Sequence, residues 1–525
     1  MRSKRRRYTS GILPKRQSII SAVRYAALFV MLMIPRTVYG FKYFPVVDDW
    51  FLYYGSSVRA NQAVNLSSRP FAALADRYIF MPMAGKMIIA QLLLMLMLAA
   101  SVYLIYKAFE SSRITCGAFL MLMIAMPPIG FEGVYWVSAA SRIVPSVFFI
   151  ALALYTESRY ISTGKKTYLI IFIVSGMFAV GFYEMLIPVY FAATALAALS
   201  LGKKRWVIAV PAAFTIAAMV YYKINGSDPS ISDRVMFVEA DGFWQHIADL
   251  FKDYRILFTE IQAQLISESV YDGTAAFMAN PAYAAAAVVS AGAFAYTAKG
   301  ERGKSILFDA AAGVCLILAA VSVNVLMAYI RLPFRVAYPV CIGAALIAEL
   351  LLCRIKPVFI YKAFIFCTAL LCMFSSAGQV SLYCHVHNED CKYANMLMQD
   401  EKVTDSRYLT YIFSERKYCY NDRLQYWEYV KSAEESYASL TGMIKYQSGK
   451  ADMNNIIPVH ENEIIGDYDY DSEVFNYYYL NKEGSLEKCT AVEVGENYNL
   501  ISEGSGFIGS LTYVDGEYRY NEYQG

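Results

Sequence analysis

Long apolar runs recur along the first 380 residues and alternate with short polar segments. Runs of roughly 20 apolar residues are long enough to cross a bilayer as helices. Lys and Arg gather at every second turn between these runs, near residues 1–16, 107–113, 159–166, 203–205, 299–304 and 354–362. Because basic loops stay in the cytoplasm, the pattern predicts an all-α polytopic membrane protein with about 11 transmembrane helices, its N-terminus inside and its C-terminus outside.

Two stretches depart from simple spans. Residues 167–201 are apolar throughout and too long for one helix across a bilayer, although both flanks are basic. We therefore expect two short helices joined by an outer hairpin at 181–188. Residues 241–264 carry apolar side chains at helical spacing between charges, which predicts an amphipathic helix on the outer leaflet. This helix falls in one of two long outer loops, expected at 38–84 and 225–274.

Composition and charge divide the chain into regions. Hydrophobic residues make up 57% and charged residues 17%, against about 25% charged in ordinary soluble domains, which excludes a cytosolic enzyme. Residues 386–525 hold 12 Lys/Arg and 25 Asp/Glu, whereas the preceding residues hold 35 and 19. We therefore expect a basic cytoplasmic N-terminus (1–18), a transmembrane domain (19–379) and an acidic extracytoplasmic domain (380–525).

The acidic tail holds 20 of the 44 tyrosines. Aromatic or alternating runs at 474–480 and 507–514 predict strands, and 422–446 predicts a helix, so we expect a small α+β domain. Aromatic faces can stack on sugars, but Tyr is also a common strand residue, and both interpretations stay open.

Polar residues at the expected outer surface are the candidates for chemistry. Asp48 and Asp49 follow the first apolar run directly. Paired carboxylates there can act as a general base or bind a divalent cation (Mg or Mn), so these two residues are also the candidate metal ligands. The alternative is that both acids cap the helix that follows them.

Four arginines are candidates for binding a phosphate. Arg69 precedes a proline, which holds it extended, and Arg142, Arg331 and Arg335 lie at the outer ends of spans, where the positive-inside pattern does not expect them. A guanidinium suits bidentate binding of a phosphate, although contact with lipid headgroups is the alternative. Glu184 stands alone in an apolar stretch, either in a functional site or as the packing partner of a buried arginine.

Several familiar signals are absent. The sequence has no Walker A motif, no Gly-rich dinucleotide fingerprint and no His-Glu-x-x-His, and nothing in it indicates a nucleic-acid partner. Cys384, His385, His387 and Cys391 are too irregularly spaced for a typical zinc site. Cys384, Cys391, Cys419 and Cys489 lie on the expected oxidising side, where one or two disulfides can form with the pairing undetermined.

The order of the motifs resembles that of the bacterial GtrII-type glucosyltransferases of the GT-C superfamily, over residues 20–380. The resemblance rests on the Asp-Asp loop after the first helix and on the segments 68–71, 135–138, 182–184 and 335–339. It implies an inverting hexosyltransferase of the cell membrane that takes a hexose such as glucose from a polyprenyl-phosphate donor on the extracytoplasmic face. The acceptor would be a glycan or glycolipid of the cell envelope.

In that family an acid of the first outer loop is the catalytic centre, which maps here onto Asp48 and Asp49. Charge and depth in the membrane add Glu184 as a catalytic helper, and Arg69, Arg142, Arg331 and Arg335 as ligands of the donor phosphate. Two other functions stay open: a transporter or flippase of lipid-linked sugars, and a membrane anchor displaying a cell-surface interaction domain. The absence of an obvious internal repeat, together with polar residues gathered at one face, favours the enzyme.

Overall fold

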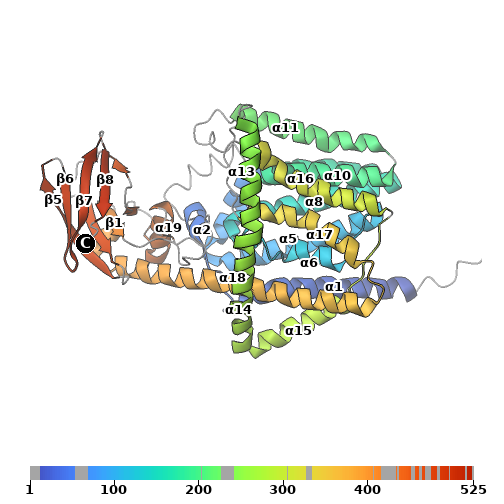
Figure 1. The fold of residues 1–525 in the computed structure, drawn as a ribbon, viewed down its shortest axis with the longest axis horizontal. Coiled ribbons are helices and arrows are strands. Elements are labelled where there is room, and N and C mark those ends of the chain that lie inside the picture. The colour runs from blue at the N-terminus through green and yellow to red at the C-terminus, as the bar shows by residue number, and fades with distance from the viewer. Residues whose placement is uncertain are drawn as a thin grey trace, which may run out of the picture. The chain divides into compact units, whose positions relative to one another are not determined.

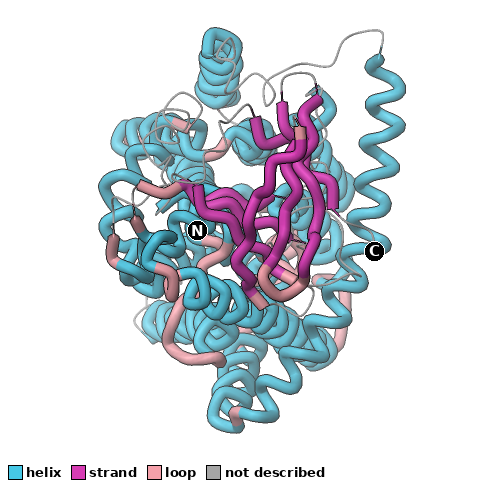
Figure 2. The backbone as a smooth tube through the Cα atoms, turned by 90° about the vertical axis from the view of Figure 1, so that its left-hand side faces the viewer, coloured by secondary structure: helices cyan, strands magenta, loops and turns pink. Residues whose placement is uncertain are grey.

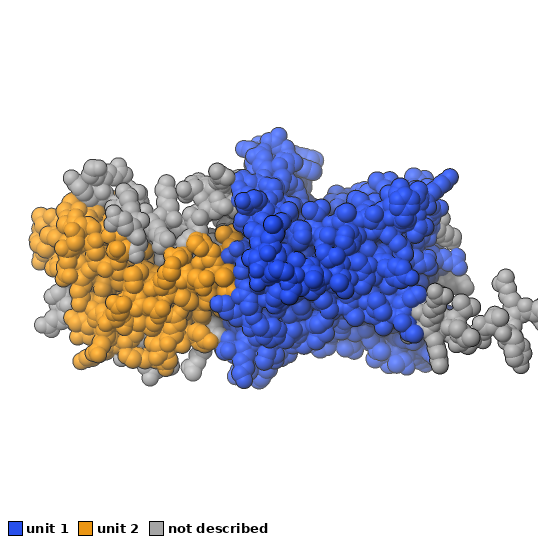
Figure 3. Space-filling model, turned by 90° about the horizontal axis from the view of Figure 1, so that it is seen from below, with its two compact units in different colours: residues 1–43, 63–381 blue, residues 44–62, 382–525 orange. Residues whose placement is uncertain are grey.

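The computed structural model divides the chain into two compact units (Figure 3). Unit 1 comprises residues 1–43 and 63–381, and unit 2 comprises 44–62 and 382–525. The expected boundary near 380 thus lies close to the observed one, but unit 2 also takes in part of the first expected outer loop. The structure describes residues 12–53, 69–202, 204–225, 242–303, 305–326, 334–405, 407–414, 433, 437–450, 456–459, 464–466, 475–481, 485–495, 497–514 and 517–522.

Unit 1 is helical throughout its described elements (Figure 1). Its longer helices are α1 (Ile12–Thr37), α5 (Met87–Ser112), α8 (Val137–Thr163), α9 (Lys166–Phe182), α10 (Ile187–Leu201), α11 (Ala209–Asn225), α13 (Phe243–Ile256), α14 (Gln262–Ala279), α15 (Pro281–Tyr296), α16 (Ile306–Leu326), α17 (Ala337–Leu352) and α18 (Val358–Leu397). The shorter ones are α4 (Pro70–Ala75), η1 (Asp76–Phe80), η2 (Met81–Lys86), α6 (Ala118–Ala125), α7 (Glu132–Tyr135), η3 (Glu184–Leu186), η4 (Arg205–Ile208), η6 (Leu257–Ile261) and η7 (Phe334–Val336). The last helix, α18, continues past residue 381 into unit 2.

Six helices in the described residues are long and apolar enough to cross a membrane, or seven if α13–α14 and α15, bent by 114°, count as one broken span. Three more apolar helices, α9, α17 and the segment Arg205–Tyr221, are shorter. The expected count of about 11 spans is therefore not confirmed, because these three apolar runs form helices shorter than the roughly 20 residues that cross a bilayer. The membrane character of the chain is confirmed, while the side on which each loop lies stays a prediction.

Both unusual stretches form the elements predicted for them. The long apolar segment divides into α9 and α10, with η3 between them. The amphipathic helix α13 runs across the long helices of unit 1 and continues through η6 into α14 (Figure 1). Its buried side is His246, Leu250 and Tyr254, whereas Trp244 and Phe251 are exposed. The helical period thus places these two aromatic residues away from the unit.

Glycines allow helices of unit 1 to approach closely. A Cβ atom at Gly343 on α17 would lie 2.6 Å from the backbone oxygen of Gly313 on α16. A Cβ atom at Gly378 on α18 would lie 1.9 Å from the oxygen of Ser269 on α14. Small residues bring backbones together in this way when packing between apolar helices has no hydrophobic driving force.

Unit 2 is an α+β domain, as predicted. Its sheet has the order β2-β1-β4-β5-β6-β7-β8-β3. The strands are drawn in magenta in Figure 2. The strands are β1 (Leu409–Ser414), β2 (Ile456–Val459), β3 (Ile464–Gly466), β4 (Phe475–Leu480), β5 (Leu486–Val494), β6 (Asn497–Ser502), β7 (Gly506–Val514) and β8 (Glu517–Glu522). The helices are α2 (Val47–Tyr53), η8 (Glu401–Thr404) and α19 (Tyr437–Ser448). Strands were predicted at β4 and β7. Of the helix expected at 422–446, residues 437–446 lie in α19, and the rest falls mostly outside the described residues.

The strand order requires the sheet to curl. β1 pairs in parallel with β2 and β4, and the remaining pairs are antiparallel. The two edge strands are consecutive in the chain, so Val459 and Ile464 can lie no more than about 18 Å apart. In a flat sheet of eight strands the edges would be ~33 Å apart. The sheet therefore bends into an open half-barrel.

The tyrosines of unit 2 fill a core. Alternation along the strands directs Tyr411, Tyr477 and Tyr520 to one side of the sheet, and all three are buried. Ile412 and Tyr478 face the other side, where they pack with residues of α18 and α19. Packing in the sheet thus accounts for these buried tyrosines, while stacking of the others on a sugar stays open.

The segment after the first helix belongs to the second of these cores. Trp50 of α2 is 1% exposed and packs with residues of α18, α19 and the sheet. Ser439 Oγ on α19 donates a hydrogen bond to the Val47 backbone oxygen at 2.9 Å. The expected first outer loop therefore supplies a helix to the C-terminal domain.

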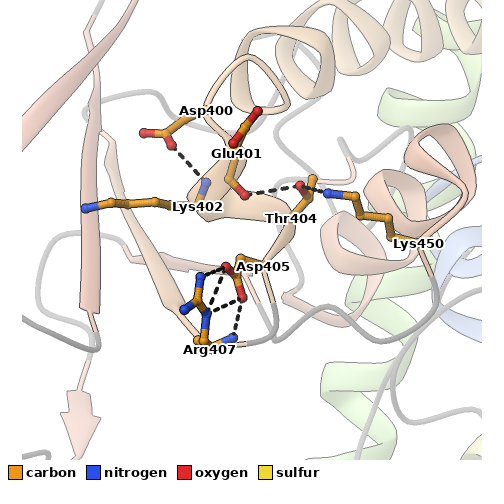
Figure 4. A network of polar contacts seen from close by, with 7 residues as sticks. All are labelled: Asp400, Glu401, Lys402, Thr404, Asp405, Arg407 and Lys450. Carbon is orange, nitrogen blue, oxygen red and sulfur yellow. Dashed lines mark hydrogen bonds and ion pairs between the residues drawn. The ribbon is translucent and has the colours of Figure 1, made fainter.

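A polar network holds the end of α18 against the sheet. Asp400 accepts a hydrogen bond from the Lys402 backbone at the start of η8 (Figure 4). The same carboxylate accepts from the Tyr478 hydroxyl and lies 2.8 Å from Lys488 Nζ. Burial alone would raise the pKa of Asp400, but the bonds from Lys488, Tyr478 and the Lys402 backbone outweigh it and lower that pKa to about 2.

This lowered pKa predicts a pH-dependent stability of unit 2. A carboxyl group with a folded-state pKa below its unfolded value stabilises the fold above pH ~4, and the contribution disappears as the pH falls towards 2. Asp400→Asn should cost about 1 kcal/mol at pH 7, after allowance for solvent screening, and almost nothing at pH 2–3. Thermal unfolding of the purified chain, followed by circular dichroism across this range, measures both values.

Glu401→Gln is the matched control, because Glu401 is exposed in the same turn and bonds Thr404 through its backbone oxygen. It should leave the midpoint unchanged at every pH. An Asp400→Asn deficit that is equally large at pH 2–3 would contradict the assigned role of the carboxylate.

Candidate anion-binding site of unit 1

The candidate site is built around a break in the helical structure between α5 and α8. α6 has only eight residues, and non-helical backbone follows from Met126 to Gly130 before the single turn of α7. Residues 131–136 are all buried. Irregular backbone inside an apolar unit is tolerated only where other groups satisfy its N–H and C=O groups.

Side chains from distant helices satisfy both ends of α6. The Leu120 N–H donates to Glu349 Oε2 at 3.0 Å, and the Ala118 N–H donates to the Tyr361 hydroxyl at 3.0 Å. At the other end, the Tyr338 hydroxyl donates to the Ile124 oxygen at 2.9 Å. Glu349, which is fully buried, therefore caps a helix.

The turn of α7 is held in the same way. Arg36 Nη2 donates to the Val134 oxygen at 3.2 Å, and Gln91 donates to the Tyr135 oxygen. The Val137 N–H donates to the Tyr43 hydroxyl at 2.9 Å. These bonds fix the backbone that presents Glu132 and Trp136.

Glu132 pairs with Arg335. The two side chains form an ion pair in which Glu132 is 1% and Arg335 is 22% exposed. The Arg335 guanidinium also lies over the Trp136 ring, 6.0 Å from its centroid. Arg335 belongs to η7, which directly follows residues outside the described part of the chain, and Arg331 is among those residues.

Arg69 pairs with Glu184. Arg69 Nε donates to Glu184 Oε2 at 2.6 Å, and a second guanidinium nitrogen bonds Oε1, which makes the contact bidentate. Arg69 immediately precedes α4 with φ −142° and ψ 69°, outside the helical region, as expected before a proline. The side chains are 18% and 20% exposed, so Glu184 is the partner of a partly accessible arginine.

Tyr183 connects the two pairs. Burial raises the pKa of its hydroxyl; Glu184 and Glu132 raise this pKa further, while Arg335 and Arg69 oppose them. All four charged side chains thus lie within electrostatic range of one phenol. The Arg69 guanidinium is 5.2 Å from the centroid of the Tyr183 ring. The result is a cluster of two arginines and two carboxylates, here called the Tyr183 cluster.

Arg142 is placed differently. It pairs with Asp76 of η1 at 2.7 Å, and the two side chains are 6% and 3% exposed. Ser141 Oγ donates to the same carboxylate at 3.2 Å, and Arg142 donates to the Ser138 oxygen. The hydrogen bonds of Arg142 are thus made inside the unit, and its role as a ligand of the donor phosphate stays a prediction.

Asp48 and Asp49 belong to unit 2. Asp49 is fully buried at the third position of α2, where Oδ2 accepts the Val46 N–H at 3.1 Å. This is the acidic half of a capping box. Asp48, one position earlier, is partly exposed. The capping alternative therefore holds for Asp49, whereas Asp48 remains accessible.

The metal-ligand role of Asp48 and Asp49 stays a prediction. No group of three or more His, Cys, Asp or Glu residues is arranged to hold a metal ion in the part of the chain that the structure describes. The His387 ring stacks on Trp50 with centroids 6.1 Å apart. Cys384, Cys391 and Cys489 form no disulfide with one another among the described residues, and Cys419 lies outside them.

Some members of the site were not among the predicted site residues. Asp76 lies in the first expected outer loop and Tyr183 in a segment that carries the resemblance, but the partners of Asp76 and Glu132 are far away in sequence. Arg36 sits at the end of the first apolar run, where a charge beside Pro35 was the available signal.

No family model matches the chain, and no curated protein is significantly similar to it.

The buried ion pair of Asp76 and Arg142 gives a prediction about the stability of unit 1. Removing one partner of a buried ion pair leaves the other charge uncompensated, so Asp76→Asn should lower the free energy of unfolding by about 3–5 kcal/mol. The double variant Asp76→Leu/Arg142→Met should recover most of that loss, because it removes both charges. Thermal unfolding in detergent measures the three proteins.

Glu110→Gln is the comparison, since Glu110 forms a more exposed pair with Lys107. It should cost less than about 1 kcal/mol. Equal midpoints for Asp76→Asn and Glu110→Gln would show that the Asp76–Arg142 pair does not stabilise the unit.

Proposed function

We propose that the chain is a membrane glycosyltransferase that moves a hexose from a polyprenyl-phosphate carrier to a glycan or glycolipid of the cell envelope, on the extracytoplasmic face. The Tyr183 cluster carries the proposal. It offers two partly exposed guanidinium groups in an apolar helical unit, which is the chemistry needed to bind the phosphate of a lipid carrier. The motif resemblance supplies the sugar and the reaction class.

The carboxylates of the cluster suit an exchange of partners. In the absence of donor, Glu184 holds the Arg69 guanidinium in a bidentate contact. A donor phosphate presents the same two-oxygen geometry with more negative charge, so it can replace Glu184 as the partner of Arg69. The same phosphate would also bind the Arg335 guanidinium. The released carboxylate is then available to orient the acceptor hydroxyl.

The reaction follows from these roles. The acceptor oxygen attacks the anomeric carbon while the bond from that carbon to the phosphate oxygen breaks, which inverts the configuration. The acceptor proton passes to a carboxylate, and the lipid phosphate leaves with its negative charge stabilised by arginine. In this proposed step, protein side chains accept the proton and stabilise the leaving phosphate.

The arginine assignment predicts a kinetic effect. Arg69→Gln and Arg335→Gln should each lower kcat/KM about 10- to 100-fold, mainly through KM for the donor, because each removes a charged hydrogen bond to the phosphate. Transfer of labelled hexose from a polyprenyl-phosphate donor in detergent gives these constants. Arg77→Gln is the matched control, since Arg77 is exposed in the same segment.

Two results would oppose the proposal. An unchanged KM for the donor in both arginine variants would show that the donor phosphate does not bind at the Tyr183 cluster. Movement of the lipid-linked sugar across vesicle membranes without any glycosylated product would favour the transporter or flippase.

The resemblance assigns catalysis to Asp48 and Asp49, and the structure of α2 sharpens the test. We expect Asp48→Asn to abolish transfer with an unchanged thermal midpoint, because its carboxylate is partly exposed. Asp49→Asn should lower the free energy of unfolding by up to about 1 kcal/mol, and with it the midpoint, since it weakens a cap. Full activity of the Asp48→Asn/Asp49→Asn protein would exclude both acids from the chemistry while leaving the arginine prediction standing.

A further inference from the structure

One long helical segment of unit 1 runs across its neighbours. α13, η6 and α14 follow one another directly over Phe243–Ala279, and this segment, here called the transverse helix, lies across α16 and α18 (Figure 1). It meets α16 where His246 Nε2 donates to the Asn324 backbone oxygen at 2.9 Å. It meets α18 at Gly273, where a Cβ atom would lie 1.9 Å from the Phe374 backbone oxygen.

Both crossings lie about one hydrocarbon thickness from the starts of α16 and α18. Asn324 is ~27 Å from the first residue of α16, and Phe374 is ~24 Å from the first residue of α18, at 1.5 Å per helical residue. The two starts lie together, because Arg302 Nε, before α16, donates to the Cys353 backbone oxygen, before α18, at 3.1 Å. Since the hydrocarbon core of a bilayer is roughly 30 Å thick, the transverse helix lies at the level of a membrane surface.

One side of α13 faces the protein and another is apolar but exposed. His246 and Tyr254 belong to the buried side, and Asn324 Nδ2 donates to the Tyr254 hydroxyl at 2.8 Å. Trp244 and Phe251 are seven residues apart, about two turns, so they share a second line of the helix. Their side chains are 79% and 72% exposed.

A third line of α13 is polar. Gln245, Asp249 and Lys252 are exposed at helical spacing, and Gln245 Nε2 donates to Asp249 Oδ1 at 3.0 Å. Successive residues point ~100° apart around a helix, so this line is turned away from both the Trp244 line and the buried side. A helix at a membrane surface has three such surroundings, which are protein, lipid and water.

The charges of α13 argue against its being half of a broken span. Asp249, Lys252, Asp253 and Arg255 stand within its 14 residues. In a spanning helix these groups would lie in hydrocarbon, where ionised side chains are costly and face the protein interior or a cavity. At the membrane surface the same groups reach water, and Trp is enriched there.

We propose that the transverse helix binds the headgroup layer of one leaflet. Trp244 and Phe251 reach about 5–10 Å into the boundary between headgroups and acyl chains, while the Gln245 line faces water. The contacts with α16 and α18 then fix the depth of these two helices in the bilayer. This placement does not depend on the proposed glycosyl transfer.

Tryptophan fluorescence of the full chain in phosphatidylcholine nanodiscs tests the placement. The signal of Trp244 is the difference between the wild type and Trp244→Phe. Lipids brominated near the glycerol end of their acyl chains should quench this signal at least twofold more strongly than lipids brominated near the chain ends, because the ring lies at the interface.

The matched control adds Gln245→Trp to the Trp244→Phe protein, which moves the reporter by one residue onto the polar line. Acrylamide in the water should quench this reporter strongly, and either brominated lipid should quench it several-fold less than it quenches Trp244. If Trp244→Phe does not fold, Phe251→Trp adds a reporter to the same apolar line with Trp244 retained, and the added signal should show the same preference as Trp244.

Three results would overturn the proposal. Stronger quenching of Trp244 by the lipids brominated near the chain ends would place α13 in a span. Quenching of Trp244 by acrylamide without any quenching by lipid would place its exposed side in water. Equal quenching of Trp244 and the Gln245→Trp reporter by the lipids would show that α13 has no side reserved for lipid.

Discussion

The helical unit depends on satisfying the backbone of the broken segment between α5 and α8. Where α6 ends after eight residues, peptide groups are left without helical partners inside an apolar unit. Tyr361, Glu349, Tyr338, Gln91 and Arg36 supply the missing bonds from four other helices. The break is therefore built into the packing of the whole unit, and it places Glu132 at a fixed position beside Arg335.

In the same apolar unit, the ion pairs fall into two groups that differ in side-chain exposure. Asp76 and Arg142 satisfy each other with almost no exposure, which makes them a packing element. Arg69–Glu184 and Arg335 keep about a fifth of their surface accessible. A binding site for an anion needs a cation that is held in place yet reachable, and only the second kind of pair meets both conditions.

Sequence patterns predicted elements that depend on nearby residues and missed contacts between residues far apart in the chain. The hairpin of α9 and α10, the amphipathic α13 and the strands β4 and β7 follow from run length and periodicity over a few residues. The partner of Arg335 lies 203 residues away, and that of Arg69 lies 115 away, so composition and spacing carry no trace of either. Trp50 joins a core formed mainly by residues after 390, and the acids beside it could not be distinguished until Asp49 proved to be a cap. Glu157 escaped notice because one acid near the basic end of a span resembles a loop residue.

Glu157 also shows why burial by itself does not define a site. Glu349 and Glu157 are both fully buried acids of apolar helices, yet Glu349 is surrounded by donors that its removal would leave unsatisfied. Glu157 completes no such network, because neither of its carboxylate oxygens has a hydrogen-bond partner among the described residues.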